Sequence, residues 1–97
     1  MKAESISAIV LDKNDNVATA LRPVSTGELI QMQSGKKIIS IHVAEDIPMG
    51  HKLALVDIRR GDRLIKYGEV IGKASALIPK GSHVHVHNLR GRGNSHR

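Results

Sequence analysis

Apolar and polar positions alternate over short stretches of this chain, a pattern typical of β-strands rather than helices. Between residues 37 and 43, for example, the side chains of Ile39, Ile41 and Val43 would share one face of a strand. Residues 52–58 fit either a strand or a helical turn. Counting residues 37–43 among them, the predicted strands cover residues 5–11, 17–21, 29–33, 37–43, 64–67, 70–78 and 83–89. Because Gly, Pro and Asp separate these segments, we predict a compact all-β domain.

Turn-forming residues mark the boundaries of the predicted strands. Aspartate and asparagine crowd residues 12–16, Pro23 ends one strand, and residues 34–36 join two others as a hairpin. We find no coiled-coil heptad and no internal repeat. Residues 1–89 are predicted to form the domain, and residues 90–97, which carry no apolar side chain, are predicted to form a disordered tail.

Composition restricts the core and its chemistry. Apolar residues make up 40% of the 97 positions, but Tyr67 is the only aromatic residue, so the core must be aliphatic. We expect Tyr67 to be half-buried, with its hydroxyl satisfied. The absence of Cys excludes a disulfide framework, a thiolate metal site and a cysteine nucleophile.

The net charge of +6 is concentrated at the C-terminal end, since no acidic residue follows Glu69. A basic surface of this kind predicts an anionic partner, or alternatively a solvated face with no partner. Nucleic acid is disfavoured, because the basic residues lack the interleaved aromatic side chains on which bases stack. No apolar run approaches the ~20 residues of a membrane span, and none resembles a signal peptide, so we expect a cytoplasmic protein.

The most distinctive local pattern is an alternation of histidine and valine after Gly81. On a single strand, His83, His85 and His87 would line one face, about 7 Å apart, while Val84 and Val86 face the core. Imidazoles at this spacing are candidate ligands of a divalent metal such as Zn, Fe, Ni or Cu. The alternative is a polar histidine row that faces an anion.

Two further segments carry candidate functional groups. In Gly50-His51-Lys52, the imidazole of His51 is a candidate acid or base near neutral pH, and Lys52 is a candidate carboxylate ligand. A solvated loop is the alternative for this segment. In the second segment, Lys66 precedes Tyr67, and a lysine whose stem lies along apolar surface is the simplest interpretation.

Read together and in order, these segments resemble the small SAF-type domain of the altronate/galactarate dehydratase family, which also serves as the small subunit of (2R)-sulfolactate sulfo-lyase. The resemblance covers roughly residues 8–89 and implies a β-clip fold. It rests on residues 15–21, residues 47–55, Asp57-Ile58 with Gly61, residues 65–68 with Ile71-Gly72, and Gly81 with residues 83–88.

The resemblance also implies a chemistry, namely elimination from a hydroxy acid. Removing a proton next to a carboxylate builds negative charge, which a divalent metal or fixed cations must stabilise. The family places iron or a similar divalent metal chiefly on a large catalytic component. Since the chain continues for only eight residues past Leu89, we expect a small subunit with a separate large partner, and a homo-oligomer is also compatible.

We therefore expect His51 and His85 to act in catalysis, and Lys52, Lys66, Tyr67 and Asn88 to bind the anionic hydroxy acid. The leading hypothesis is the small subunit of a hydro-lyase acting on sugar acids. The alternatives are the small subunit of a sulfo-lyase, a sugar-acid-binding module without catalysis, and a chain whose basic tail binds RNA.

Overall fold

The computed structural model describes residues 6–91, and this range contains strands and turns but no helix. No helix long and apolar enough to cross a membrane therefore occurs within residues 6–91. The all-β fold class predicted from the sequence is confirmed, whereas the β-clip assignment stays a prediction. The strands are β1 (Ile6–Val10), β2 (Val17–Ala20), β3 (Leu29–Ser34), β4 (Lys37–His42), β5 (Lys52–Ala54), β6 (Arg63–Lys66), β7 (Glu69–Ala74), β8 (His83–Val84) and β9 (Leu89–Gly91).

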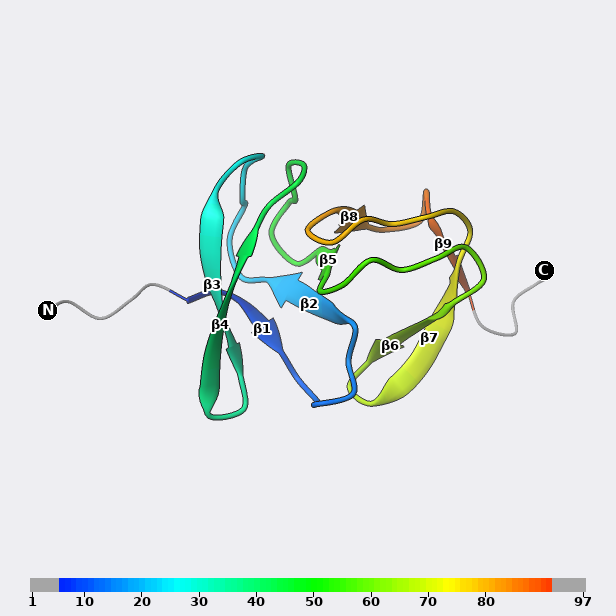
Figure 1. Cartoon of the computed structure of the whole chain (residues 1–97), viewed down its shortest axis with the longest axis horizontal. Helices are drawn as coiled ribbons and strands as arrows, with labels where there is room; N and C mark the ends of the chain where they lie inside the picture. The colour runs from blue at the N-terminus through cyan, green and yellow to red at the C-terminus, as the bar shows by residue number, and fades with distance from the viewer. Residues whose placement is uncertain (1–5, 92–97) are drawn as a thin grey trace, which may run out of the picture.

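The strands form two sheets. The larger has the order β4-β3-β1-β2-β5-β8, and the smaller has the order β6-β7-β9. All pairs are antiparallel except β1 with β3. Figure 1 shows the β3–β4 hairpin at one end of the domain and the β6–β7–β9 sheet at the other, with β1, β2 and β5 between them. The predicted hairpin at residues 34–36 is the β3–β4 hairpin.

Two cores hold these layers together, where the chain length predicts only one, and both are aliphatic as the composition predicted. The larger core lies around β1, β2 and β3, and includes the fully buried side chains of Ile30, Met32 and Leu53. The smaller core connects β5 with the second sheet, and includes Leu64 and Val84. Burying side chains of this size stabilises a fold by roughly 1.5–3 kcal/mol each. Strands β2 and β5 each contribute residues to both cores, so these two neighbouring strands join the two ends of the domain.

A turn of the same form recurs along the described residues. In each turn a buried aliphatic residue is followed three positions later by a glycine with positive φ. The aliphatic residues pair across the molecule as isolated bridges, Val24 with Ile47 and Ile58 with Ile78. The second and fourth turns are bonded alike, since the amides of Gly50 and Gly81 donate to the carbonyls of Ala20 and Ala54. The four turns are residues 24–27, 47–50, 58–61 and 78–81.

The largest departure from the sequence-based expectation lies at the histidine–valine alternation. Residues 83–89 were expected to be one strand, but β8 ends at Val84, residues 85–88 form a turn, and β9 starts at Leu89. Val84 is fully buried as expected, whereas Val86 is 79% exposed and does not face the core. Strand-like alternation therefore ends after Val84. The side chain of Asn88 bonds the backbone of His85 and His83 and so closes the turn that follows.

Smaller differences concern strand ends and the single aromatic residue. Tyr67 is exposed rather than half-buried, because it occupies the β6–β7 turn with a φ of 59°. Strand β7 ends at Ala74 rather than continuing to residue 78. Arg90 and Gly91 belong to β9 and pair with Lys73 and Gly72, although the sequence analysis placed them in the tail. The rest of that predicted tail, residues 92–97, lies outside the described residues.

Candidate functional site

Strands β5 and β8 bring the two histidine-containing segments together. Their antiparallel register pairs Lys52 with Val84 and Leu53 with His83. Continuing this register by one residue past each strand places His51 opposite His85. Each segment follows one of the recurring turns, and the carbonyl of His51 accepts a hydrogen bond from the amide of Ala20 at 2.8 Å. Segments far apart in the chain therefore meet on a fixed backbone.

Four imidazoles gather at this place, which we call the histidine cluster (His51, His83, His85 and His87). The rings of His51 and His85 stack with centroids 3.9 Å apart and planes 13° apart. The ring of His83 stacks on both, at 5.0 Å from His51 and 5.4 Å from His85. The Nδ1 of His51 and the Nε2 of His83 lie 2.8 Å apart, so one ring donates a hydrogen bond to the other.

His87 holds an outer position in the cluster. Its ring lies 5.2 Å from that of His83 and is tilted by 40°, and its side chain is exposed. The predicted metal ligands were His83, His85 and His87. In the structure the ring nitrogens that come within 4.8 Å of one another belong to His51, His83 and His85. Tertiary pairing, rather than alternation along one strand, therefore decides which imidazoles converge.

Asn88 fixes the backbone that carries two of these histidines. Its Oδ1 accepts a hydrogen bond from the amide of His85 at 2.9 Å, and its Nδ2 donates to the carbonyl of His83 at 2.8 Å. Both ends of its amide are engaged in the turn, so Asn88 positions the backbone of His83 and His85. Substrate binding by Asn88 stays a prediction.

A carboxylate that the sequence did not predict to be functional also lies at this site. Strand β8 is at the edge of its sheet, and the amide of His83 donates to Oε1 of Glu45 at 2.8 Å. Glu45 is far from the histidine–valine segment in sequence, and no local pattern marks it. Its negative charge acts on His83 and raises the pKa of that imidazole, against the other charges of the cluster.

The electrostatics of the cluster favour neutral imidazoles at its centre. Burial lowers the pKa of His83, the charges of His51, His87 and His85 lower it further, and Glu45 opposes them. The pKa of His85 is also lowered, first by loss of solvent contact and then by the charges of His51 and Lys52. A neutral imidazole can accept a proton or bind a metal, so both predicted chemistries remain open to these side chains.

Lys52 adds positive charge next to the cluster, and Lys66 lies near Lys52. Burial lowers the pKa of Lys52, and the neighbouring charge of Lys66 lowers it further. The ammonium of Lys66 lies 5.1 Å from the ring centre of Tyr67, within the range of a cation–π contact. Of the predicted substrate-binding residues, the structure therefore brings Lys52 close to His85, Lys66 close to Lys52, and Tyr67 beside Lys66.

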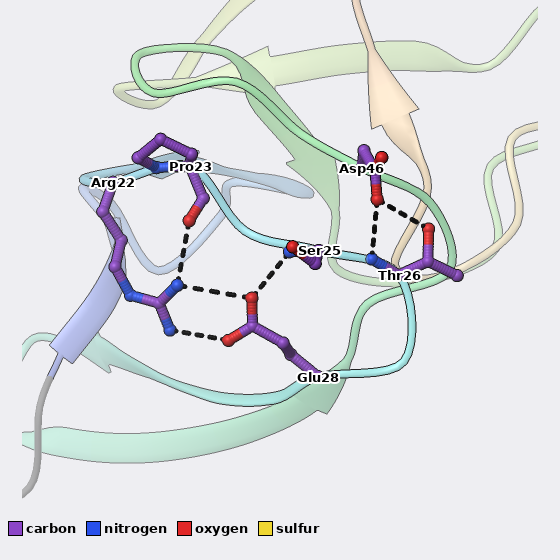
Figure 2. Close-up of polar contacts among 6 residues, drawn as sticks. All are labelled: Arg22, Pro23, Ser25, Thr26, Glu28 and Asp46. Atoms are coloured by element: carbon purple, nitrogen blue, oxygen red, sulfur yellow. Dashed lines mark hydrogen bonds and ion pairs between the residues drawn. The ribbon is translucent and has the colours of Figure 1, made fainter.

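An open depression of about 360 Å³ adjoins the histidine cluster, and His83 forms part of its wall. The rest of the wall comes from the first two recurring turns and the residue before each, namely Pro23, Val24, Ser25, Asp46, Ile47 and Pro48. Figure 2 shows the polar network that fixes these turns. Asp46 accepts hydrogen bonds from the amide and hydroxyl of Thr26, both at 2.9 Å. These bonds therefore tie the two turns that line the depression to each other.

An ion pair completes this network. Arg22 bonds Glu28 at 2.8 Å, and the amide of Ser25 donates to the same carboxylate (Figure 2). These bonds lower the pKa of Glu28, with the Arg22 contact as the larger cause. The pKa of Asp46 is lowered by its two bonds to Thr26. Both carboxylates therefore stay ionised at neutral pH and keep the turns in place.

The molecule is thus a small all-β domain that presents a cluster of imidazoles, with Lys52 next to the cluster and a depression beside His83. The family model of the altronate/galactarate dehydratase SAF domain matches residues 6–92, and the chain belongs to this family. It is 44% identical over 84 residues to altronate dehydratase of Bacillus subtilis (strain 168), an alignment that covers 87% of this chain and 16% of that protein. It is 39% identical over 74 residues to galactarate dehydratase (L-threo-forming) of Escherichia coli (strain K12), covering 76% and 13%.

A third relative is similar along almost its whole length. This is the (2R)-sulfolactate sulfo-lyase subunit alpha of Chromohalobacter salexigens, 34% identical over 89 residues, with 89% of this chain and 95% of that protein covered. Its name implies an enzyme of more than one subunit. The chain thus spans only a small part of the dehydratases but nearly all of the sulfo-lyase subunit. The family resemblance stated from the sequence is confirmed, and the relatives are lyases.

Proposed function

We propose that this chain is the small subunit of a hydro-lyase that eliminates water from a sugar acid, working with a separate large catalytic subunit. One observation carries the proposal: the two segments most characteristic of the resemblance, Gly50-His51-Lys52 and residues 83–88, meet in one cluster. Identity to the dehydratases supports a hydro-lyase. A cytoplasmic location belongs to the proposal, and cell fractionation tests it.

The residues of the cluster suit different parts of such an elimination. Lys52 and Lys66 attract the carboxylate of the hydroxy acid, and Tyr67 lies beside them at the rim. His85, whose lowered pKa keeps it neutral, is suited to accept a proton, and His51 stacks against it. When His51 carries a proton, it is placed to donate that proton to a leaving hydroxyl. The acid and the base would then be neighbouring rings on one rigid strand pair.

The resemblance implies a divalent metal, iron or similar, held mainly by the large subunit. Such a metal would stabilise the negative charge that develops next to the substrate carboxylate. The chemistry of the cluster is compatible with a site shared between two subunits, because its imidazoles and ammonium groups reach the surface of this chain. The small subunit would contribute proton transfer and carboxylate binding.

The proposal is tested by searching the genes beside this chain's own for a large lyase subunit and co-expressing the two chains. We expect the two chains to co-purify and to dehydrate altronate or galactarate. Ala at His85 or Lys52 should lower turnover at least tenfold while the complex still assembles, and Ala at His42, a histidine on β4, should not. Co-purification without lyase activity on any hydroxy acid would contradict the proposal.

A sulfo-lyase is the second candidate, and the 95% coverage of the sulfo-lyase subunit alpha favours it. The elimination follows the same logic, with sulfite leaving in place of hydroxide. Supplying (2R)-sulfolactate to the same complex separates the two candidates, because released sulfite identifies a sulfo-lyase. Saturable binding of sugar acids by the chain alone, with no partner recovered, would instead indicate a binding module.

A further inference from the structure

We infer that His51, His83 and His85 form a binding site for a divalent transition metal ion on this chain itself. Their ring nitrogens lie within 4.8 Å of one another, and all three side chains are partly buried. The three residues come from two segments that are distant in sequence. The strand pairing that joins these segments also fixes the spacing of the rings.

The donor set specifies the class of metal. Three imidazole nitrogens suit Zn²⁺, Fe²⁺, Ni²⁺ or Cu²⁺, whereas Mg²⁺ and Ca²⁺ prefer oxygen ligands. Three protein ligands leave a coordination position open, as in catalytic rather than structural zinc sites. The carboxylate of Glu45, bonded to the amide of His83, supplies a neighbouring negative charge that would offset part of the charge of the ion.

The rings need only a small rearrangement to bind an ion. The nitrogens of His51 and His83 are 2.8 Å apart and share a hydrogen bond, whereas two tetrahedral zinc ligands lie roughly 3.3 Å apart, given metal–nitrogen distances of about 2.0–2.1 Å. The rings are stacked within 10–18° of parallel and must turn for their lone pairs to converge. Rotation about the terminal torsion of histidine is broad and inexpensive.

The backbone, in contrast, is already in place. His51 is held by its carbonyl bond to Ala20, and His83 by its amide bond to Glu45. Asn88 bonds the amide of His85 and the carbonyl of His83. Because these hydrogen bonds already hold the backbone in place without the ion, binding the ion costs little further conformational entropy. The site is thus built at the level of the backbone and requires only ring rotation.

His87 lies outside this ligand set and provides a matched control. It belongs to the same turn as His85, but its tilted ring contacts only His83 and it is not among the converging nitrogens. If metal bound to the histidine row without a defined site, His87 would contribute as much as its neighbours, and His87→Ala would lower the affinity. If the site is defined by the other three rings, His87→Ala leaves the affinity nearly unchanged.

The test uses the full chain with any affinity tag removed, so that the only histidines are its own. We expect calorimetric titration with Zn²⁺ to give one ion per chain, and Co²⁺ to give the visible absorption of a site with low coordination number. Ala at His51, His83 or His85 should lower the affinity at least tenfold, and Ala at His87 should change it less than threefold. No binding, or an equal loss in the His87→Ala variant, would overturn the inference.

A measurement on the unsubstituted chain guards against variants that fail to fold. With ¹⁵N-labelled histidine, Zn²⁺ should move the ring-nitrogen resonances of His51, His83 and His85 by direct coordination and leave that of His42 in place. Unmoved resonances at the three sites would refute the site without any substitution. The inference extends the proposed function, but turnover by the complex and metal binding by this chain are separate readouts and can fail separately.

Discussion

Replacing Gly81 by Ala should destabilise the domain more than the same replacement at Gly50. Both glycines end a recurring turn, with φ angles of 85° and 84°, and their amides make equivalent 2.8 Å bonds to the carbonyls of Ala54 and Ala20. Their surroundings differ. A methyl group at Gly50 would meet no atom within 4 Å, whereas one at Gly81 would overlap the carbonyl oxygen of His42 and lie 3.2 Å from the backbone nitrogen of Ala44.

The two effects can be separated by magnitude. Positive φ costs an L-residue about 1–2 kcal/mol, and this term applies to both variants. Forcing a methyl group against backbone that cannot move aside adds about 1–3 kcal/mol at Gly81 alone. The expected losses are therefore about 1–2 kcal/mol for Gly50→Ala and about 2–5 kcal/mol for Gly81→Ala, out of a stability of about 5–15 kcal/mol.

Urea unfolding followed by far-ultraviolet circular dichroism measures both losses, since the chain has no Trp to report by fluorescence. Equal m-values for the two variants would show that the difference arises from stability and not from a changed unfolded state. Each kcal/mol should also lower the melting temperature by about 4–8 °C. Equal losses at the two positions would refute the reasoning, because they would show that only the turn conformation matters and the contact at Gly81 does not.

Three further predictions concern hydrogen bonds and pH. Asp15→Ala removes the carboxylate that accepts hydrogen bonds from the amides of Tyr67 and Gly68. Because hydrogen bonds to a charged acceptor contribute about 1.5–3 kcal/mol, we expect a loss of stability of about 2–4 kcal/mol and faster amide exchange in that turn. Asn88→Ala leaves two backbone groups of the histidine turn without partners, and urea unfolding should show a loss of about 1–3 kcal/mol. Because the pKa of His83 and that of His85 are lowered in the folded state, the unfolded chain binds more protons, and stability should decline as the pH falls below about 6.5.

Each of these predictions has a control within the chain. Asp12→Ala removes a bond to the exposed amide of Asn14, and should cost less than Asp15→Ala. His87→Ala should leave the stability nearly unchanged, and a loss equal to that of Asn88→Ala would contradict the role of the asparagine. For the pH effect, His83→Gln should flatten the dependence of the urea midpoint between pH 7.5 and 5.5. An unchanged slope in that variant would contradict the assignment to the histidine cluster.

Most strands were predictable because their signals are local. The β3–β4 hairpin follows from apolar runs on either side of Gly35, and β2 ends before Pro23 as expected. The histidine turn was not predictable in the same way. Alternation of His and Val is the signature of a strand, but the side chain of Asn88 satisfies two backbone groups and makes a turn more favourable from residue 85.

The sequence by itself determined an all-β domain with an aliphatic core, membership of a lyase-related family, and the residue types available for chemistry. Only the tertiary structure decided which of these residues meet. His51 joins His83 and His85 because β5 and β8 pair, and Glu45 reaches the same site although it is distant in the chain. The physical reason is that strand periodicity governs neighbours two residues apart, whereas contacts between strands depend on register and on turns closed by side chains far away in sequence.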